Sequence, residues 1–166
     1  MDLFEAIEKR SSVRAYVPAT IPEAHLLKIV DAGRRAPSGC NRQPLQFILI
    51  RNPETLKALE RVQACFASAA AAVGIVADPT ASRWWLEDAA AAAENMLLAI
   101  AALGYASVWV EGTLLKHEDY AKQLLGVPAA KRFIVLLPVG KPPQDTPQAD
   151  KKPLDEVLWR ERYGQK

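Results

Sequence analysis

Residues 89–104 have the sequence AAAAAENMLLAIAALG and form the most apolar segment of the chain. Glu94 and Asn95 interrupt this segment, and it is shorter than the roughly 20 apolar residues that a membrane-spanning helix requires. We therefore predict a buried helix within a folded domain. Its alanine side chains are small, so they would allow other backbone segments to approach it closely.

Apolar runs of strand length flank this predicted helix on both sides. Turn residues close the runs, as in Asn52-Pro53 and Asp78-Pro79. The predicted strands are 45–53, 71–79, 105–112 and 132–142, and helical patterns cover 1–10, 20–37, 54–63 and 116–128. Interleaved helices and mostly buried strands predict an α+β or an α/β fold, with helices against a sheet, in a single domain over residues 1–166.

Two of the predicted helices carry terminal signals. Thr20 is the expected N-cap of the second helix, with Glu23 completing a capping box and Pro37 ending the helix. Gly126 stands near the end of the helix predicted over 116–128.

The composition excludes several classes of protein. The chain has 166 residues, half of them hydrophobic, and a formal net charge of +2, which disfavours a general nucleic-acid binder. Cys40 and Cys65 are too few and too far apart for a disulfide framework or a zinc site, and His25 and His117 lack metal-type partners. With neither a signal peptide nor a membrane span in the sequence, we expect a cytoplasmic protein.

The common nucleotide and hydrolase motifs are also missing. The sequence contains no G-x-G-x-x-G after a strand, no G-x-x-x-x-G-K-S/T and no G-x-S-x-G. Any cofactor site must therefore be built from other residues.

The stretch KRSSVRAY, residues 9–16, follows the first predicted helix. Its cations, Lys9, Arg10 and Arg14, bracket the hydroxyls of Ser11 and Ser12. Arginine side chains match phosphate oxygens bidentately, and hydroxyl and backbone N–H groups can complete such a site. The alternative is a solvated run of charge beside a helix C-terminus, where cations are favourable in any case.

The stretch RRAPSGCNRQPLQF, residues 34–47, leads into a predicted strand. Pro37 and Gly39 shape its backbone, while Ser38, Asn41 and Gln43 offer neutral donors and acceptors that suit the edge of a heteroaromatic ring. The alternative, an elaborate turn, would explain the proline and the glycine but not the amides. Cys40 within it is expected to be a small buried side chain rather than a reactive thiol.

Together these stretches resemble the signature of the nitroreductase family of flavin enzymes, R-x-S-x-R-x-F/Y followed by A-P-S-x-x-N-x-Q-P-x-x-F. NMLLAIAALGYASVWVEG (95–112) resembles the family's long central helix and the strand after it. LPVGKPPQ (137–144) and KKPLDEVLWRERYG (151–164) resemble the C-terminal parts of its compact members. The resemblance covers nearly the whole chain.

The resemblance implies an α+β fold, with a mixed sheet flanked by helices, in a single domain over residues 1–166. It also implies a homodimer with FMN at the subunit interface and the long helix between the subunits. On the long helix, a face of Ala90, Ala93, Leu97 and Ala101 would pack on its two-fold mate, the alternative being an ordinary core helix. Trp84 and Trp85 would form a wall or lid. The positions that match flavin-binding positions of the family are Arg10, Ser11, Ser12, Arg14, Pro37, Ser38, Gly39, Asn41, Gln43, Glu111, Gly112, Lys151 and Lys152. Of these, 37–43 would come from the partner subunit, Glu111 and Gly112 would act through their backbone beside flavin N5, and Lys151 or Lys152 would bind the phosphate.

The function implied is an FMN-dependent oxidoreductase. It would move a hydride from NADH or NADPH through the flavin to a small electron-poor acceptor, such as a nitroaromatic or a quinone. The cofactor would carry most of the chemistry, which agrees with a sequence that shows no catalytic triad or carboxylate pair. The alternative is a flavin-binding module for storage or sensing with little turnover.

Overall fold

A three-stranded antiparallel sheet lies at the centre of the computed structural model, which describes residues 1–165. Its strands are β1 (Leu45–Ile50), β2 (Ala71–Ala77) and β3 (Arg132–Val139), in the order β1-β2-β3. Gly74 in the middle of β2 is opposite Ile48 on β1 and Leu136 on β3, which fixes the register. The three runs predicted at 45–53, 71–79 and 132–142 are therefore confirmed as strands.

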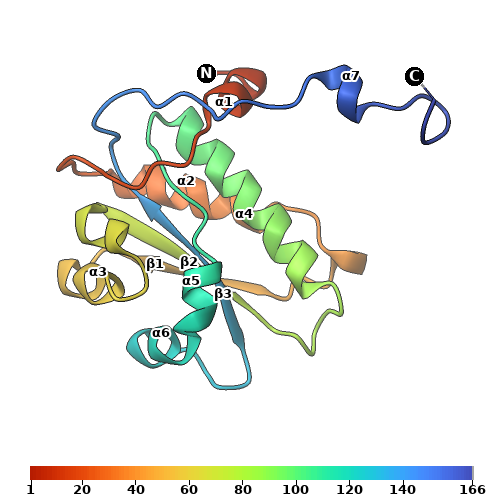
Figure 1. Cartoon of the computed structure of the whole chain (residues 1–166). Coiled ribbons are helices and arrows are strands. Elements are labelled where there is room, and N and C mark those ends of the chain that lie inside the picture. Colours follow the sequence, from red (N-terminus) through yellow and green to blue (C-terminus); the bar gives the residue numbers. More distant parts are fainter. Residues whose placement is uncertain (166) are drawn as a thin grey trace.

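Helices cover both faces of this sheet (Figure 1). The long helix α4 packs on α2, and α1 packs on α4. The opposite face carries α3, α5, α6 and the short 3-10 turn η2. The bounds are α1 Leu3–Lys9, α2 Glu23–Arg34, η1 Gly39–Asn41, α3 Pro53–Leu59, η2 Ala64–Ser68, α4 Trp85–Ala102, α5 Gly112–Lys116, α6 Glu118–Leu125 and α7 Leu154–Val157.

Alternation along β2 builds two hydrophobic cores, one on each face of the sheet. Ala71, Val73 and Ile75 pack with α2 and α4, whereas Ala72 and Val76 pack with the elements on the other face. Successive side chains of a strand point to opposite faces, so a strand buried on both faces is apolar throughout. The α+β class is thus confirmed, and no helix among the described residues is long and apolar enough to cross a membrane.

The prediction of a fourth strand at 105–112 is wrong, because this segment forms no strand in the structure. This segment touches β3 only through isolated bridges, Ala106 with Gly140 and Val110 with Leu136. The same register would pair Val108 with Pro138, and a proline has no N–H to donate to the ladder. The sheet predicted to be mixed is antiparallel along its three strands. A parallel bridge between Ser12 and Ser107 lies outside these strands.

Two further predictions about helices need correction. The N-cap of α2 is Pro22, without a side-chain capping bond, because Thr20 precedes the first helical residue by three positions. A capping box exists instead at α1, between Asp2 and Glu5.

The predicted dimer face of α4 is also corrected. Ala93 and Leu97 are buried inside this chain at 0% and 4% exposure, so they do not lie on a face open to a second subunit.

Glu118 and Arg132 join α6 to β3 by an ion pair with N–O distances of 3.0–3.2 Å. The Phe133 N–H also donates to Glu118 Oε1 at 2.9 Å. Burial raises the pKa of the Glu118 carboxyl, but these hydrogen bonds outweigh burial and the net pKa lies below its usual value.

A depressed folded-state pKa stabilises the fold above the unfolded-state pKa of about 4.3, and the effect is lost as the pH falls through the folded-state pKa. We therefore expect Glu118→Gln to lower Tm at neutral pH and to reduce the further loss of Tm between about pH 5 and pH 3. Thermal unfolding across this pH range measures both effects. Asp119→Asn, on the exposed neighbouring carboxylate, is the matched control, and an equal response of both variants would contradict the assignment.

Candidate functional site

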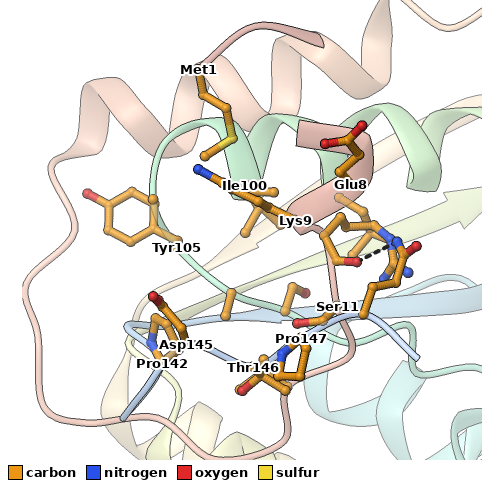
Figure 2. Close-up of a pocket in the computed structure, with 18 residues that line it drawn as sticks. Met1, Glu8, Lys9, Ser11, Ile100, Tyr105, Pro142, Asp145, Thr146 and Pro147 are labelled. Carbon is orange, nitrogen blue, oxygen red and sulfur yellow. Dashed lines mark hydrogen bonds between the residues drawn. The ribbon is translucent and has the colours of Figure 1, made fainter. Parts of the chain in front are cut away.

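A cavity of about 540 Å³ opens between the end of α1, the C-terminal half of α4 and residues 142–148 (Figure 2). Its walls combine apolar side chains, such as Leu97 and Ile100, with hydroxyls, two cations and two carboxylates. The polar and charged residues that line it are Glu8, Lys9, Arg10, Ser11, Tyr105, Ser107, Asp145, Thr146 and Gln148.

Arg10 and Ser11 stand at the C-terminal end of α1, where Arg10 is the C-cap and its N–H donates to the Ala6 carbonyl. Both residues are half-buried and line the cavity. The Gln148 amide donates to the carbonyls of Ile7 and Arg10 at 3.0 and 2.9 Å, which fastens the 142–148 segment across the end of α1. Gln148 carries no sequence signal that would have marked it.

Ser107 is 3% exposed, and its Oγ has no hydrogen-bond partner among the described residues. A buried hydroxyl without a partner is rare in folded proteins and calls for an explanation, such as a ligand or a water molecule. The lining residues include the guanidinium of Arg10, the ammonium group of Lys9 and the hydroxyls of Ser11 and Ser107, which are donors that a phosphate and a polyol chain require. The carboxylates of Glu8 and Asp145 line the same cavity.

Ser12 and Arg14 are exposed and do not line this cavity. Ser12 is bridged to Ser107, and the Val13 N–H donates to the Ser107 carbonyl at 2.9 Å, so the backbone of 12–13 forms the sheet edge. The predicted cluster thus presents Arg10 and Ser11 to the cavity, and Ser12 and Arg14 to the surface beside it.

The loop 37–43 has a strained backbone. Cys40, Asn41 and Gln43 all have left-handed φ values, of 51°, 54° and 50°. Asparagine tolerates this region, but cysteine and glutamine rarely adopt it, and such strain concentrates at functional sites. The Gln43 N–H donates to Ser38 Oγ at 3.0 Å, and the Gln43 side chain donates to the Asn41 carbonyl at 3.4 Å. The side chains of Ser38 and Gln43 therefore also maintain the loop, and Cys40 is exposed rather than buried as predicted.

Residues just before α4 and in its first turn contact this loop and hold it in place. The Gly39 N–H donates to Asp88 Oδ1 at 2.8 Å, and Ser82 Oγ donates to Asp88 Oδ2 at 2.9 Å. A Cβ atom on Gly39 would lie 2.3 Å from Cε3 of Trp84, so the glycine is explained by packing against this ring. No motif singles out Asp88, since a carboxylate in the first turn of a helix is common.

The two predicted halves of the site lie at opposite ends of α4. The 37–43 loop contacts Trp84 and Asp88 at its start, whereas the cavity at Arg10 contacts Leu97, Ile100 and Ala101 near its end. Asp88 and Ala101 are 13 residues apart, which is roughly 20 Å along a helix. One chain alone does not bring the two halves together.

The remaining predicted residues lie outside the cavity. Glu111 precedes α5, which begins at Gly112, and Glu111 Oε2 accepts a hydrogen bond from Trp109 Nε1 at 3.0 Å. Lys151 and Lys152 are exposed in the extended tail after β3, which runs past α1 (Figure 1). Pro37 is exposed at the start of the loop.

The other titratable groups have structural roles. Tyr16 is buried and donates to the Val13 carbonyl at 2.7 Å; burial raises its pKa, as does the nearby Cys65. Burial likewise raises the pKa of the Cys65 thiol to about 11. His25 Nδ1 lies 2.9 Å from the hydroxyl of Tyr105. Among the described residues, no group of three or more His, Cys, Asp or Glu side chains is placed to hold a metal.

Comparison with known proteins agrees with this architecture. The model of the nitroreductase family matches residues 7–75 and 62–141. A protein of Archaeoglobus fulgidus named "Putative NADH dehydrogenase/NAD(P)H nitroreductase" is 32% identical over 173 residues, covering 98% of this chain and 99% of its own. An "NADH dehydrogenase" of Thermus thermophilus is 27% identical, covering 96% of this chain and 97% of its own.

Solved structures of similar proteins have the same fold. A nitroreductase-type protein from Desulfovibrio desulfuricans, solved in complex with FMN, has a TM-score of 0.85 and 27% identity, covering 98% of each chain. A structure from Bacteroides thetaiotaomicron has a TM-score of 0.89 at 22% identity, covering 95% of this chain and 96% of its own, which supports the fold. The family match spans most of the chain and includes both motif stretches. The chain therefore belongs to the nitroreductase family.

Proposed function

We propose that this protein is an FMN-dependent oxidoreductase that uses NADH or NADPH to reduce a small electron-poor acceptor, such as a nitroaromatic or a quinone. The observation that carries the proposal is the half-buried Arg10 beside Ser11, in a cavity large enough for part of a cofactor. Ser107 also lines this cavity, and its hydroxyl has no hydrogen-bond partner among the described residues. Membership of the nitroreductase family supports FMN as that cofactor, as does the FMN complex of the Desulfovibrio desulfuricans relative.

The site is completed in a homodimer, in which each FMN lies between residues 10–14 of one subunit and the 37–43 loop of the other. The separation of these segments along α4 supports this arrangement. Large exposed hydrophobic side chains on α1 and α7 also support it, because such side chains suit contact with a second copy. They include Leu3, Phe4, Leu154 and Val157, which are 57–73% exposed.

Each part of the chain has a defined role toward the cofactor. Arg10, with Arg14 and Lys151 or Lys152, supplies positive charge for the phosphate and for the electron-rich edge of the ring. Ser11 and Ser12 hydrogen-bond the ribityl chain or phosphate. Backbone groups at Glu111 and Gly112 would hold the flavin ring, and Pro37, Ser38 and Asn41 of the other subunit would contact it.

FMN, when bound, supplies the hydride acceptor and donor of the reaction. The chain's own residues bind it, orient it and leave one face open to the nucleotide and then to the acceptor. No side chain needs to serve as a nucleophile. We expect the protein in the cytoplasm, where the two cysteines, both free among the described residues, would stay reduced.

The visible spectrum of the purified protein tests the proposal. We expect a flavin spectrum that bleaches within seconds when NADH or NADPH is added without oxygen, and that recovers when a quinone follows. A bound flavin that stays oxidised with both nucleotides would favour a binding module for storage or sensing. A protein that binds no FMN even after reconstitution would refute both.

A further inference from the structure

Asp88 is buried, at 4% exposure, although it carries a carboxylate. Both of its oxygens are used: Oδ1 accepts from the Gly39 N–H at 2.8 Å and Oδ2 accepts from Ser82 Oγ at 2.9 Å. Ser82 Oγ in turn accepts from the Trp84 N–H at 3.2 Å. Buried carboxylates are uncommon unless they are hydrogen-bonded in this way, and this one links the start of α4 to a loop 49 residues earlier.

Trp84 is the second contact of α4 with that loop. Its six-membered ring fills the space beside Gly39, where a Cβ would lie 2.3 Å from Cε3. The Arg83 guanidinium stacks on the ring at 4.3 Å from its centroid, which restricts the rotation of the indole. The ring thus forms a fixed surface against which the loop rests.

The loop needs such support because its own hydrogen bonds connect loop residues to one another and do not fix the loop on the core. They are the bonds from the Asn41 N–H to the Ser38 carbonyl at 2.9 Å, from the Arg42 N–H to the Gly39 carbonyl at 3.1 Å, and from Gln43 to Ser38 and Asn41. Left-handed φ values at Cys40, Asn41 and Gln43 are unfavourable for a free chain and persist only where surrounding structure imposes them. Within the loop the side chain of Ser38 accepts one hydrogen bond, from the Gln43 N–H. The bond from Gly39 to Asp88 is the long-range hydrogen bond that joins the strained turn to the core.

We infer that Asp88 and Trp84 are positioning residues: they hold the 38–43 loop in its left-handed conformation and so set the surface that this loop presents to the FMN of the other subunit. This inference rests on the proposed function. Neither residue needs to touch the flavin, since each acts through Gly39.

Asp88→Ala tests the role of the carboxylate. Because it removes both acceptors, we expect FMN to bind about 10-fold more weakly and to be reduced more slowly at saturating FMN. Asp88→Asn keeps an acceptor for the Gly39 N–H, so it should restore FMN affinity to within about 3-fold of the wild type. Glu87→Ala, which removes an exposed carboxylate from the same helical turn, is the matched control and should bind FMN like the wild type.

Fluorescence titration of FMN and Tm of the apoprotein are measured on each variant. If Asp88 were merely structural, Asp88→Ala would lower Tm while the folded protein bound FMN as the wild type does, and that result would overturn the inference. If Asp88→Ala does not fold, Trp84→Ala replaces it, with the same loss of FMN affinity expected and an unchanged affinity counting against the inference. A wild-type protein that binds no FMN would instead refute the proposed function itself.

Discussion

Replacing Arg10 with alanine should leave the purified protein almost free of FMN. The side chain is half-buried at the end of α1, lines the cavity and is the innermost arginine of the RSSVRAY stretch. A hydrogen bond to a charged group contributes about 1.5–3 kcal/mol, so we expect the Kd for FMN to rise roughly 10- to 100-fold. The Gln148 bond to the Arg10 carbonyl is a backbone contact and is available in the variant.

The control is Arg51→Ala, which removes an exposed arginine from a surface ion pair with Glu23 at 3.2 Å. An exposed pair contributes little to stability, and Arg51 stands beyond the end of β1, so FMN binding should be unchanged. Fluorescence titration of both apoproteins with FMN gives the comparison. Equal affinities for FMN would mean that the cavity does not hold the phosphate and that Arg14, Lys151 or Lys152 supplies the charge.

The parts of the fold that were predictable from the sequence are those fixed by local patterns. The apolar runs of β1, β2 and β3 and the alanine-rich pattern of α4 identify their own secondary structure. Gly126 marks the end of α6 because a left-handed φ, here 68°, is the usual way to end a helix. None of these predictions required knowledge of a distant partner.

The failed predictions depended on distant partners. The run at 105–112 has strand composition, but its pairing depends on Pro138, about 30 residues later, which cannot donate to it. The burial predicted for Cys40 failed for another reason: its exposure follows from the conformation of the 37–43 loop, whose left-handed φ values no pattern in the sequence specifies. The burial of Ala93 and Leu97 likewise depends on how α4 sits on the sheet, which helical periodicity alone does not determine.

The residues of the candidate site also fall into those that the sequence predicts and those that it does not. Arg10, Ser11, Ser38 and Asn41 could be identified because they stand in contiguous motifs. Asp88 and Ser107 could not, since each is an isolated polar residue whose importance comes from burial: one is fully hydrogen-bonded and the other has no partner among the described residues. An apolar run marks its own burial in the sequence, but the burial of an isolated polar residue depends on the assembled chain, and no local pattern marks it.

Coexpressing two inactive variants should recover flavin binding if the site is shared between subunits. Arg10→Ala removes the guanidinium that lines the cavity at the end of α1. Gly39→Ala should displace the 37–43 loop, because the added Cβ would collide with Trp84. Each homodimer should therefore bind FMN poorly. In a heterodimer one site carries both changes and the other carries neither, because a two-fold dimer exchanges identical segments between its subunits.

Purification through two different affinity tags isolates that heterodimer, and FMN content is then measured per chain. A shared site predicts FMN in about half of the sites, with normal affinity, compared with almost none in either parent homodimer. A site formed within one chain predicts no recovery, since every chain still carries one damaging change. The roughly 20 Å of α4 between Asp88 and Ala101 argues for the first result, because Arg10 or the loop would have to leave its contacts with α4 to close that distance within one chain.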